Sequence, residues 1–126
     1  MKIDARLLEA LTEQAVEAAP KECCGLLWSR GEQPITRLTP YPGPLYCERF
    51  HMQDDWLLRE FYQGRQAGFT AKGYYHSHCR CKAVPSSRDL VGHPPGSLCV
   101  IVTPSGVARA FRMEEDGFRE QTIQPV

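Results

Sequence analysis

The stretch Tyr74-Tyr75-His76-Ser77-His78, followed by Pro85-Ser86-Ser87-Arg88-Asp89, decides how the rest of the chain is interpreted. Aromatic residues favour strands, and residues i and i+2 of a strand point to the same face, about 6.6–6.8 Å apart. Two imidazoles on one face can therefore converge on one metal ion at about 2.0–2.1 Å. We interpret residues 69–78 as a central strand that ends in a metal site.

Three further polar residues complete a hydrolytic site in this interpretation. Asp89 lies eleven positions after His78, so a short loop and one helical turn bring its carboxylate round as a third ligand and leave a fourth position for water. Zinc lowers the pKa of such a water to about 7. Glu22, at the start of a buried strand, is the candidate general base. The Ser86 hydroxyl is a candidate donor to the developing oxyanion. The pattern predicts one catalytic zinc ion bound by His76, His78 and Asp89.

Together these residues resemble the signature of a known family. Glu22, His76-Ser77-His78 and Pro85-Ser86-Ser87-Arg88-Asp89 are similar to the pattern of the JAMM (MPN+) zinc metalloproteases, which is a glutamate followed by H-x-H and S-x-x-D. Glu22-Cys23-Cys24-Gly25-Leu26-Leu27 also matches the style in which the family's catalytic glutamate sits. The resemblance spans about residues 19–102 and is specific because all parts match together.

The resemblance implies a sheet flanked by helices, similar to the fold of cytidine deaminases. It implies that His76, His78 and Asp89 hold zinc, that Glu22 is the general base and that Ser86 stabilises the tetrahedral intermediate. The implied reaction is hydrolysis of the bond after the C-terminal glycine of a ubiquitin-like or sulfur-carrier protein. Related small members often dimerise, so a homodimer is a further expectation.

The cysteines after the second histidine leave two alternatives open. The family commonly has proline directly after that histidine, where this chain has Cys79, with Cys81 two residues further on. His76, His78, Cys79 and Cys81 would make a closed structural zinc site with four N and S ligands, although Cys79 starts on the opposite strand face from His78. Alternatively, a thiolate beside the metal would occupy the position of the water and regulate the enzyme.

Two other function classes fit the sequence less well. A non-catalytic scaffold of the same fold usually lacks one or more of the ligands, whereas this chain has them all. A nucleobase deaminase needs H-x-E and P-C-x-x-C, and neither is in the sequence. The catalytic interpretation is therefore preferred.

Composition limits the class of protein. A chain of 126 residues with 42% apolar residues fits a single domain, which we take to be residues 1–126. Fifteen basic and fifteen acidic residues cancel, so charge gives no support for a nucleic-acid or membrane partner. The N-terminus has charges where a signal peptide needs its apolar region, so we expect a cytoplasmic protein whose thiols at Cys23, Cys24 and Cys99 are buried in the core.

The order of predicted elements gives an α/β (α+β) fold, a single-domain mixed β-sheet flanked by helices. One helix is capped by Asp4 and ends at Pro20, with Leu8, Leu11, Ala15 and Ala18 facing inward. Asp54 or Asp55 caps a second helix, which ends at Gly68 and turns Trp56, Leu57, Phe61 and Leu58 inward. A short third helix covers residues 86–91. Strands are predicted at 22–28, 33–39, 69–78, 98–102, 107–113 and 118–123, with residues 45–50 extended.

An extended substrate tail commonly binds by adding a strand to an exposed edge. We expect the walls of its groove to be residues 45–51 and the loop 91–97. His51 and His93 are interpreted as surface residues, and Ser77 as a structural residue that points away from the metal.

Overall fold

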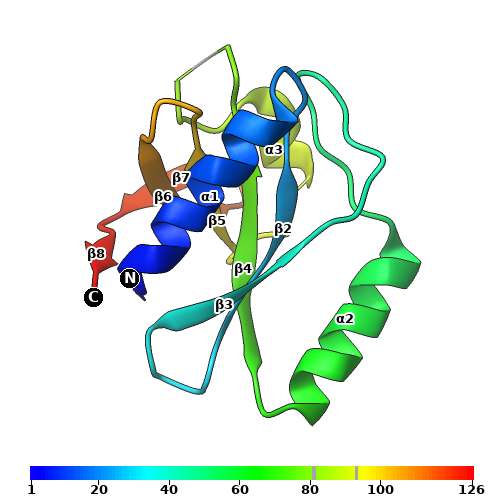
Figure 1. Cartoon of the computed structure of the whole chain (residues 1–126), viewed down its shortest axis with the longest axis vertical. Helices are drawn as coiled ribbons and strands as arrows, with labels where there is room; N and C mark the ends of the chain where they lie inside the picture. Colours follow the sequence, from blue (N-terminus) through cyan, green and yellow to red (C-terminus); the bar gives the residue numbers. More distant parts are fainter. Residues whose placement is uncertain (81, 93) are drawn as a thin grey trace.

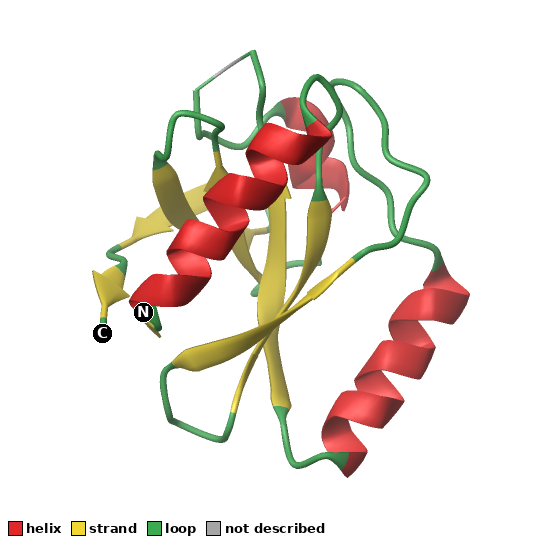
Figure 2. Cartoon of the chain, in the orientation of Figure 1, coloured by secondary structure: helices red, strands yellow, loops and turns green. Residues whose placement is uncertain are grey.

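The computed structural model describes residues 1–80, 82–92 and 94–126, without the side chains of residues 90–92. Cys81 and His93 therefore lie outside the described residues. One mixed sheet has the strand order β7-β6-β5-β4-β2-β3-β1-β8, with helices packed on it (Figures 1 and 2). The elements are β1 (Lys2–Ile3), α1 (Ala5–Ala18), β2 (Cys24–Ser29), β3 (Ile35–Pro40), α2 (Asp54–Gln66), β4 (Thr70–Ser77), α3 (Ser87–Gly92), β5 (Leu98–Val102), β6 (Ala108–Glu114), β7 (Gly117–Gln121) and β8 (Gln124–Pro125).

Helices α1 and α2 cover opposite faces of the sheet. In β2, Leu27 packs in the core cluster that holds the α1 residues, whereas Leu26 packs in a cluster with Trp56 of α2. Because successive residues of a strand point to opposite faces, the two helices must lie on different sides. Figure 1 shows α1 crossing the sheet and α2 alongside the start of β4. The predicted mixed sheet flanked by helices is confirmed.

Helix α1 begins as predicted. The Asp4 side chain accepts a hydrogen bond from the backbone N–H of Arg6 at 2.9 Å, which caps the helix. Its buried stripe consists of Leu7, Leu11 and Ala15. Leu8, which was predicted on this stripe, is only partly buried at its edge. Each large side chain buried in this way contributes on the order of 1.5–3 kcal/mol.

Helix α2 differs from the prediction in two details. Its N-cap is Gln53, and Asp54 and Asp55 occupy the first turn, where carboxylates interact favourably with the helix dipole. Leu58 is 68% exposed, so its predicted inward position was wrong, because the buried face is centred on Trp56 and leaves Leu58 on the other side. Gly68 ends the segment with φ +84° as predicted.

The central strand β4 lies between an antiparallel and a parallel neighbour. It pairs antiparallel with β2, with Gly25 opposite Tyr75, and parallel with β5, with His76 opposite Ile101. A parallel pair needs a crossover connection, and α3 forms part of that connection. Helix α3 comes early in this connection, before the chain crosses to the start of β5, and Asp89 in its first turn contacts His78 beyond the end of β4.

The segment from residue 45 to residue 50 is not the extended stretch that was predicted. Tyr46 pairs with Glu22 in an isolated antiparallel bridge, but Glu48 has φ +61°, which turns the chain. The strands β1 and β8 were not predicted. Each has two residues, and both are parallel partners at the sheet edge. In the described part of the chain, no helix is long and apolar enough to span a bilayer.

Candidate metal and catalytic site

Three side-chain atoms meet at the end of β4 in a small triangle. The Nε2 atoms of His76 and His78 are 3.1 Å apart, and Oδ2 of Asp89 lies 3.2 Å from the first and 3.1 Å from the second. Tetrahedral ligands at the usual zinc distances are about 3.3–3.4 Å apart. The three atoms are thus spaced like one face of a tetrahedral metal site.

Local structure explains why these atoms meet. His76 and His78 alternate with Ser77, so both point to one face of β4, and the His78 N–H donates to the carbonyl oxygen of Val102 at 2.9 Å. Asp89 lies in the first turn of α3. Its Oδ2 accepts from the backbone N–H of Ser86 at 2.9 Å, while the Ser86 hydroxyl accepts from the backbone N–H of Asp89 at 3.2 Å. This reciprocal capping holds the carboxylate over the strand end.

Both imidazoles are held by partners on their other nitrogen. His78 Nδ1 is 2.8 Å from the carbonyl oxygen of Lys82, and because a carbonyl only accepts, Nδ1 carries a proton and Nε2 is the nitrogen that could bind a metal ion in place of its own proton. His76 Nδ1 faces the Cys99 sulfur at 3.7 Å. The Phe50 ring stacks on His76, with centroids 4.3 Å apart and an interplanar angle of 19°. Such outer contacts orient metal-binding histidines.

Burial and charge set the protonation of this group. Burial lowers the pKa of His76, against the opposing effect of Asp89, so the ring is neutral. Burial also disfavours the charged form of His78, but the hydrogen bonds with Asp89 and the Lys82 carbonyl outweigh it and raise the pKa. Burial opposes ionisation of Asp89 too, yet both imidazoles hold its pKa well below the usual range. A carboxylate with two imidazoles is a donor set that fits zinc.

Glu22 is the second carboxyl group of the site. It is 5% exposed, and its Oε1 has no hydrogen-bond partner among the described residues. One of its carboxylate oxygens and one ring nitrogen of each of His76 and His78 lie within 4.8 Å of one another. Burial, helped by Asp89 and Glu48, raises the pKa of Glu22 to about 7. An unpartnered buried carboxylate oxygen close to the ring nitrogens of His76 and His78 fits an arrangement in which a metal ion and a water lie between these groups.

Ser86 serves the helix cap and remains available for chemistry. Its hydroxyl accepts from the Asp89 N–H and therefore keeps its own proton to donate. It lines a pocket together with Glu22, Cys79 and Arg88. The cap, which was the simpler interpretation of Ser86-x-x-Asp89, is thus compatible with a role as an oxyanion donor.

Of Cys79 and Cys81, which leave a closed zinc site or a thiol switch as alternatives, the structure describes only Cys79. The Cys79 sulfur lies 3.3 Å from the Lys21 carbonyl oxygen, to which it donates, and it lines the same pocket as Glu22 and Ser86. Cys81 lies outside the described residues. The closed site and the thiol switch therefore stay predictions. Ser77, by contrast, points away as predicted, because its hydroxyl accepts from the Cys23 N–H at 2.9 Å.

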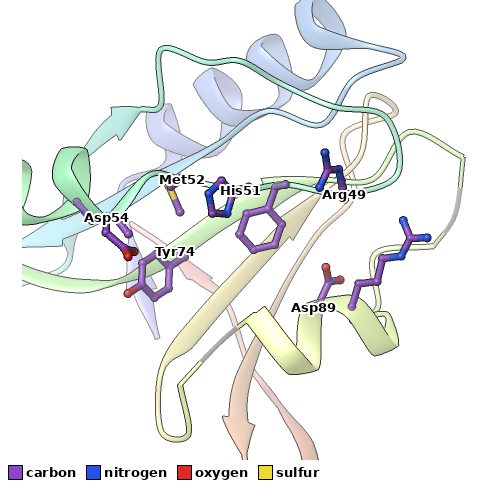
Figure 3. Close-up of a pocket in the computed structure, with 9 residues that line it drawn as sticks. Arg49, His51, Met52, Asp54, Tyr74 and Asp89 are labelled. Atoms are coloured by element: carbon purple, nitrogen blue, oxygen red, sulfur yellow. The ribbon is translucent and has the colours of Figure 1, made fainter.

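A second pocket, which we call the Asp89 pocket, includes Asp89 of the triangle in its lining (Figure 3). It is lined by residues 49–52, Asp54, Leu57, Tyr74, Arg88 and Asp89. Of the predicted groove wall at 45–51, residues 49–51 line this pocket, and whether the substrate tail binds there stays a prediction. The described part of the predicted loop 91–97 does not line it. Tyr74 was missed as a lining residue, although its position two residues before His76 on one strand face was a usable signal.

Comparisons with known proteins agree with this geometry. The family model described as prokaryotic homologs of the JAB domain matches residues 4–114. A desampylase from Haloferax volcanii is 28% identical over 130 residues, which cover 95% of this chain and 91% of that protein. A solution structure of a protein from Desulfitobacterium hafniense has a TM-score of 0.84 at 25% identity and covers 99% of this chain and 92% of its own.

More distant structures show the same fold. A JAB1/MPN domain protein from Archaeoglobus fulgidus has a TM-score of 0.66 at 22% identity, with 100% of this chain and 97% of that chain covered. The family model spans both carboxylates and both histidines of the site, so the resemblance read from the sequence is confirmed. The chain belongs to the JAMM/MPN family, as one of the small prokaryotic homologs of the JAB domain.

Proposed function

We propose that the chain is a zinc-dependent metallopeptidase that hydrolyses the bond after the C-terminal glycine of a ubiquitin-like or sulfur-carrier protein. The observation that carries this proposal is the triangle of His76, His78 and Asp89 beside the unpartnered carboxylate of Glu22. The similarity to a desampylase supports the substrate class. The proposed metal ligands are His76, His78 and Asp89, and the proposed catalytic residues are Glu22 and Ser86.

Asp89 is the third ligand in this proposal, and Glu22 is the base. Asp89 Oδ2 lies 3.1–3.2 Å from both imidazole nitrogens, which supports its place in the ligand set. Glu22 has a carboxylate oxygen within 4.8 Å of a ring nitrogen of each histidine and an oxygen without a hydrogen-bond partner among the described residues, which supports a role as the base beside the metal position. Zinc, when bound, lowers the pKa of a coordinated water to about 7 and polarises the substrate carbonyl.

The residues of the chain then supply proton transfer and charge stabilisation. Glu22 accepts a proton from the attacking water at its carboxylate and delivers it to the leaving amine nitrogen, a role worth roughly 10²–10⁴ in rate. The Ser86 hydroxyl donates a hydrogen bond to the oxygen that becomes negative, which is typically worth about 10²–10³ in rate. The products are a glycine carboxylate and a free amine.

The setting of this reaction is also a proposal. We infer that residues 1–126 act as one catalytic domain, in the cytoplasm and as a homodimer like related small members. Within the described residues, Cys23, Cys24, Cys47 and Cys99 form no disulfide, which agrees with a reducing compartment.

The proposal is tested by hydrolysis of a ubiquitin-like protein fused through its terminal glycine to a reporter. The zinc-loaded wild type should cleave the fusion after that glycine, whereas Glu22→Gln and the chelated wild type should not. Glu13→Gln, an exposed change on α1, is the matched control and should retain full activity. Equal cleavage by all four samples would rule out this mechanism. Zinc binding without cleavage of any glycine-ended fusion would favour the non-catalytic scaffold.

A further inference from the structure

The Asp89 pocket has a floor that runs along β4 away from the proposed metal ligands. Tyr74 and His76 are two residues apart on the same face of the strand, which corresponds to about 6.6–6.8 Å. Tyr74 lines the pocket, and the Phe50 ring that stacks on His76 lines it between the two ends. A peptide in extended conformation covers the same distance in two residues.

The two ends of the pocket have opposite charge. Arg49 and Arg88 line it beside Asp89, and Asp54 lines it beside Tyr74. Figure 3 shows Tyr74 and Asp54 together at one side of the view, with Arg49 and Asp89 at the other. Arg88 donates to the backbone carbonyl of Glu48 at 3.3 Å, which uses one of its five N–H donors.

Asp54 and the two arginines make no ion pair within the described part of the chain. The carboxylate of Asp89 is already engaged by His76 and His78. The free acidic charge of the pocket is therefore at the Tyr74 end, and the free basic charges are at the end where the bond is cleaved. A segment of complementary polarity has a negative or carbonyl group at the cleavage site and a positive group about two residues before it.

We propose that the Asp89 pocket binds the C-terminal tail of the substrate and that Asp54 selects a basic side chain two residues before the terminal glycine. The inference rests on the proposed function, because the position of the scissile carbonyl is taken from the proposed ligands. Met52 and Leu57 line the pocket and contact the aliphatic part of that side chain, while its cationic end faces Asp54. After cleavage, the new glycine carboxylate faces Arg49 and Arg88.

Asp55 provides a matched control for Asp54. Both residues lie in the first turn of α2, both are exposed, and both interact with the same helix terminus. Asp54 alone of the two lines the pocket. Asp54→Asn and Asp55→Asn therefore remove equal charge from the helix, and a difference between them reports on the pocket.

The test measures binding of short fluorescent peptides that end in Arg-Gly-Gly, Gln-Gly-Gly or Glu-Gly-Gly with a free carboxylate, by anisotropy. Wild type and Asp55→Asn should bind the arginine peptide about 5–10-fold more tightly than the glutamate peptide, as expected for an exposed charge pair. Asp54→Asn should reduce the ratio to within about twofold, and Asp54→Arg should invert it. The preference should weaken between about 50 mM and about 500 mM salt.

Several results would overturn the inference. They are equal binding of the three peptides by the wild type, an equal loss of preference in Asp54→Asn and Asp55→Asn, and no binding of any peptide. Cleavage of fusions with these three tails separates the inference from the proposed function. Efficient cleavage without a tail preference would contradict the role of Asp54 alone. Selective binding without cleavage would contradict the proposed reaction and leave the pocket assignment supported.

Discussion

Glu22→Gln should stabilise the metal-free protein at neutral pH. The wild-type carboxyl is buried, Oε1 has no hydrogen-bond partner among the described residues, and its pKa is raised from 4.5 to about 7. The folded state therefore binds the Glu22 proton more tightly than the unfolded state does. The stabilising contribution of the protonated carboxyl is complete below about pH 4.5 and is lost as the pH rises through 7.

The magnitude follows from the shift. A difference of about 2.5 pKa units at about 1.36 kcal/mol each corresponds to about 3 kcal/mol. Between pH 4.5 and pH 8, the wild type should lose roughly this much free energy of unfolding relative to Glu22→Gln. The glutamine amide of the variant does not titrate. Its cost therefore shifts the difference in free energy of unfolding by a constant and leaves the pH dependence of that difference unchanged.

Urea unfolding in the presence of a chelator measures the difference at several pH values. Wild type and Glu22→Gln are compared at each pH, so the titration of groups that do not interact with Glu22 cancels, and the remaining difference belongs to Glu22 together with its charged neighbours His78 and Asp89. Glu13→Gln, on the exposed face of α1, serves as the control and should show no comparable slope. With zinc added, the cation favours the carboxylate form of Glu22, and the advantage of the variant at high pH should shrink. If the difference in free energy of unfolding between wild type and Glu22→Gln does not change with pH in the metal-free protein, the buried Glu22 carboxyl does not have a raised pKa.

Three further predictions concern the ligands, the cap and the sheet. Asp89→Asn should weaken zinc binding more than the 10–100-fold typical of losing an outer partner, measured by competition with a chelator; unchanged affinity would remove Asp89 from the ligand set. Ser86→Ala and Ser86→Asp should both lower kcat by about 100-fold, but only the alanine variant should lose about 1 kcal/mol of stability with the cap; full activity in Ser86→Asp would exclude the hydroxyl as a donor. Gly25→Ala would place a methyl group 2.2 Å from the Thr39 carbonyl oxygen and should cost about 1–3 kcal/mol in thermal unfolding, whereas Gly117→Ala, with nothing within 4 Å, should stay within about 0.5 kcal/mol; equal effects of the two would contradict the packing of the sheet.

Patterns that repeat over several residues predicted the fold well. The apolar run before Ser29, the run from Leu98 to Val102 and the cap at Asp4 each combine period, length and end signals, and all three elements are present. The predicted inward position of Leu58 was wrong because a run of neighbouring apolar residues on a helix does not show which of them lies at the centre of the buried face. The strands β1 and β8 have two residues each, which is too short for any periodic signal.

The sequence predicted those residues of the candidate site that lie close together in the chain. It did not predict the residues that distant loops and helices bring to the site. His76 and His78 follow from the strand period, and Asp89 from the helix after it. The Phe50 ring stacks on His76 because the preceding loop turns at Glu48, which has a positive φ. No local sequence pattern predicts this turn. The sequence predicted Asp54 only as a candidate helix cap. That Asp54 also lines the Asp89 pocket depends on how α2 lies beside β4, which the sequence pattern does not give.

In the proposed function, zinc is bound by His76, His78 and Asp89 in an open site, with no cysteine ligand. X-ray absorption at the zinc edge tests this ligand set directly on the zinc-loaded wild type. We expect only nitrogen and oxygen neighbours at about 2.0–2.2 Å from zinc. Sulfur neighbours at about 2.3 Å, lost in the Cys79→Ser and Cys81→Ser pair, would contradict it and establish the closed site instead.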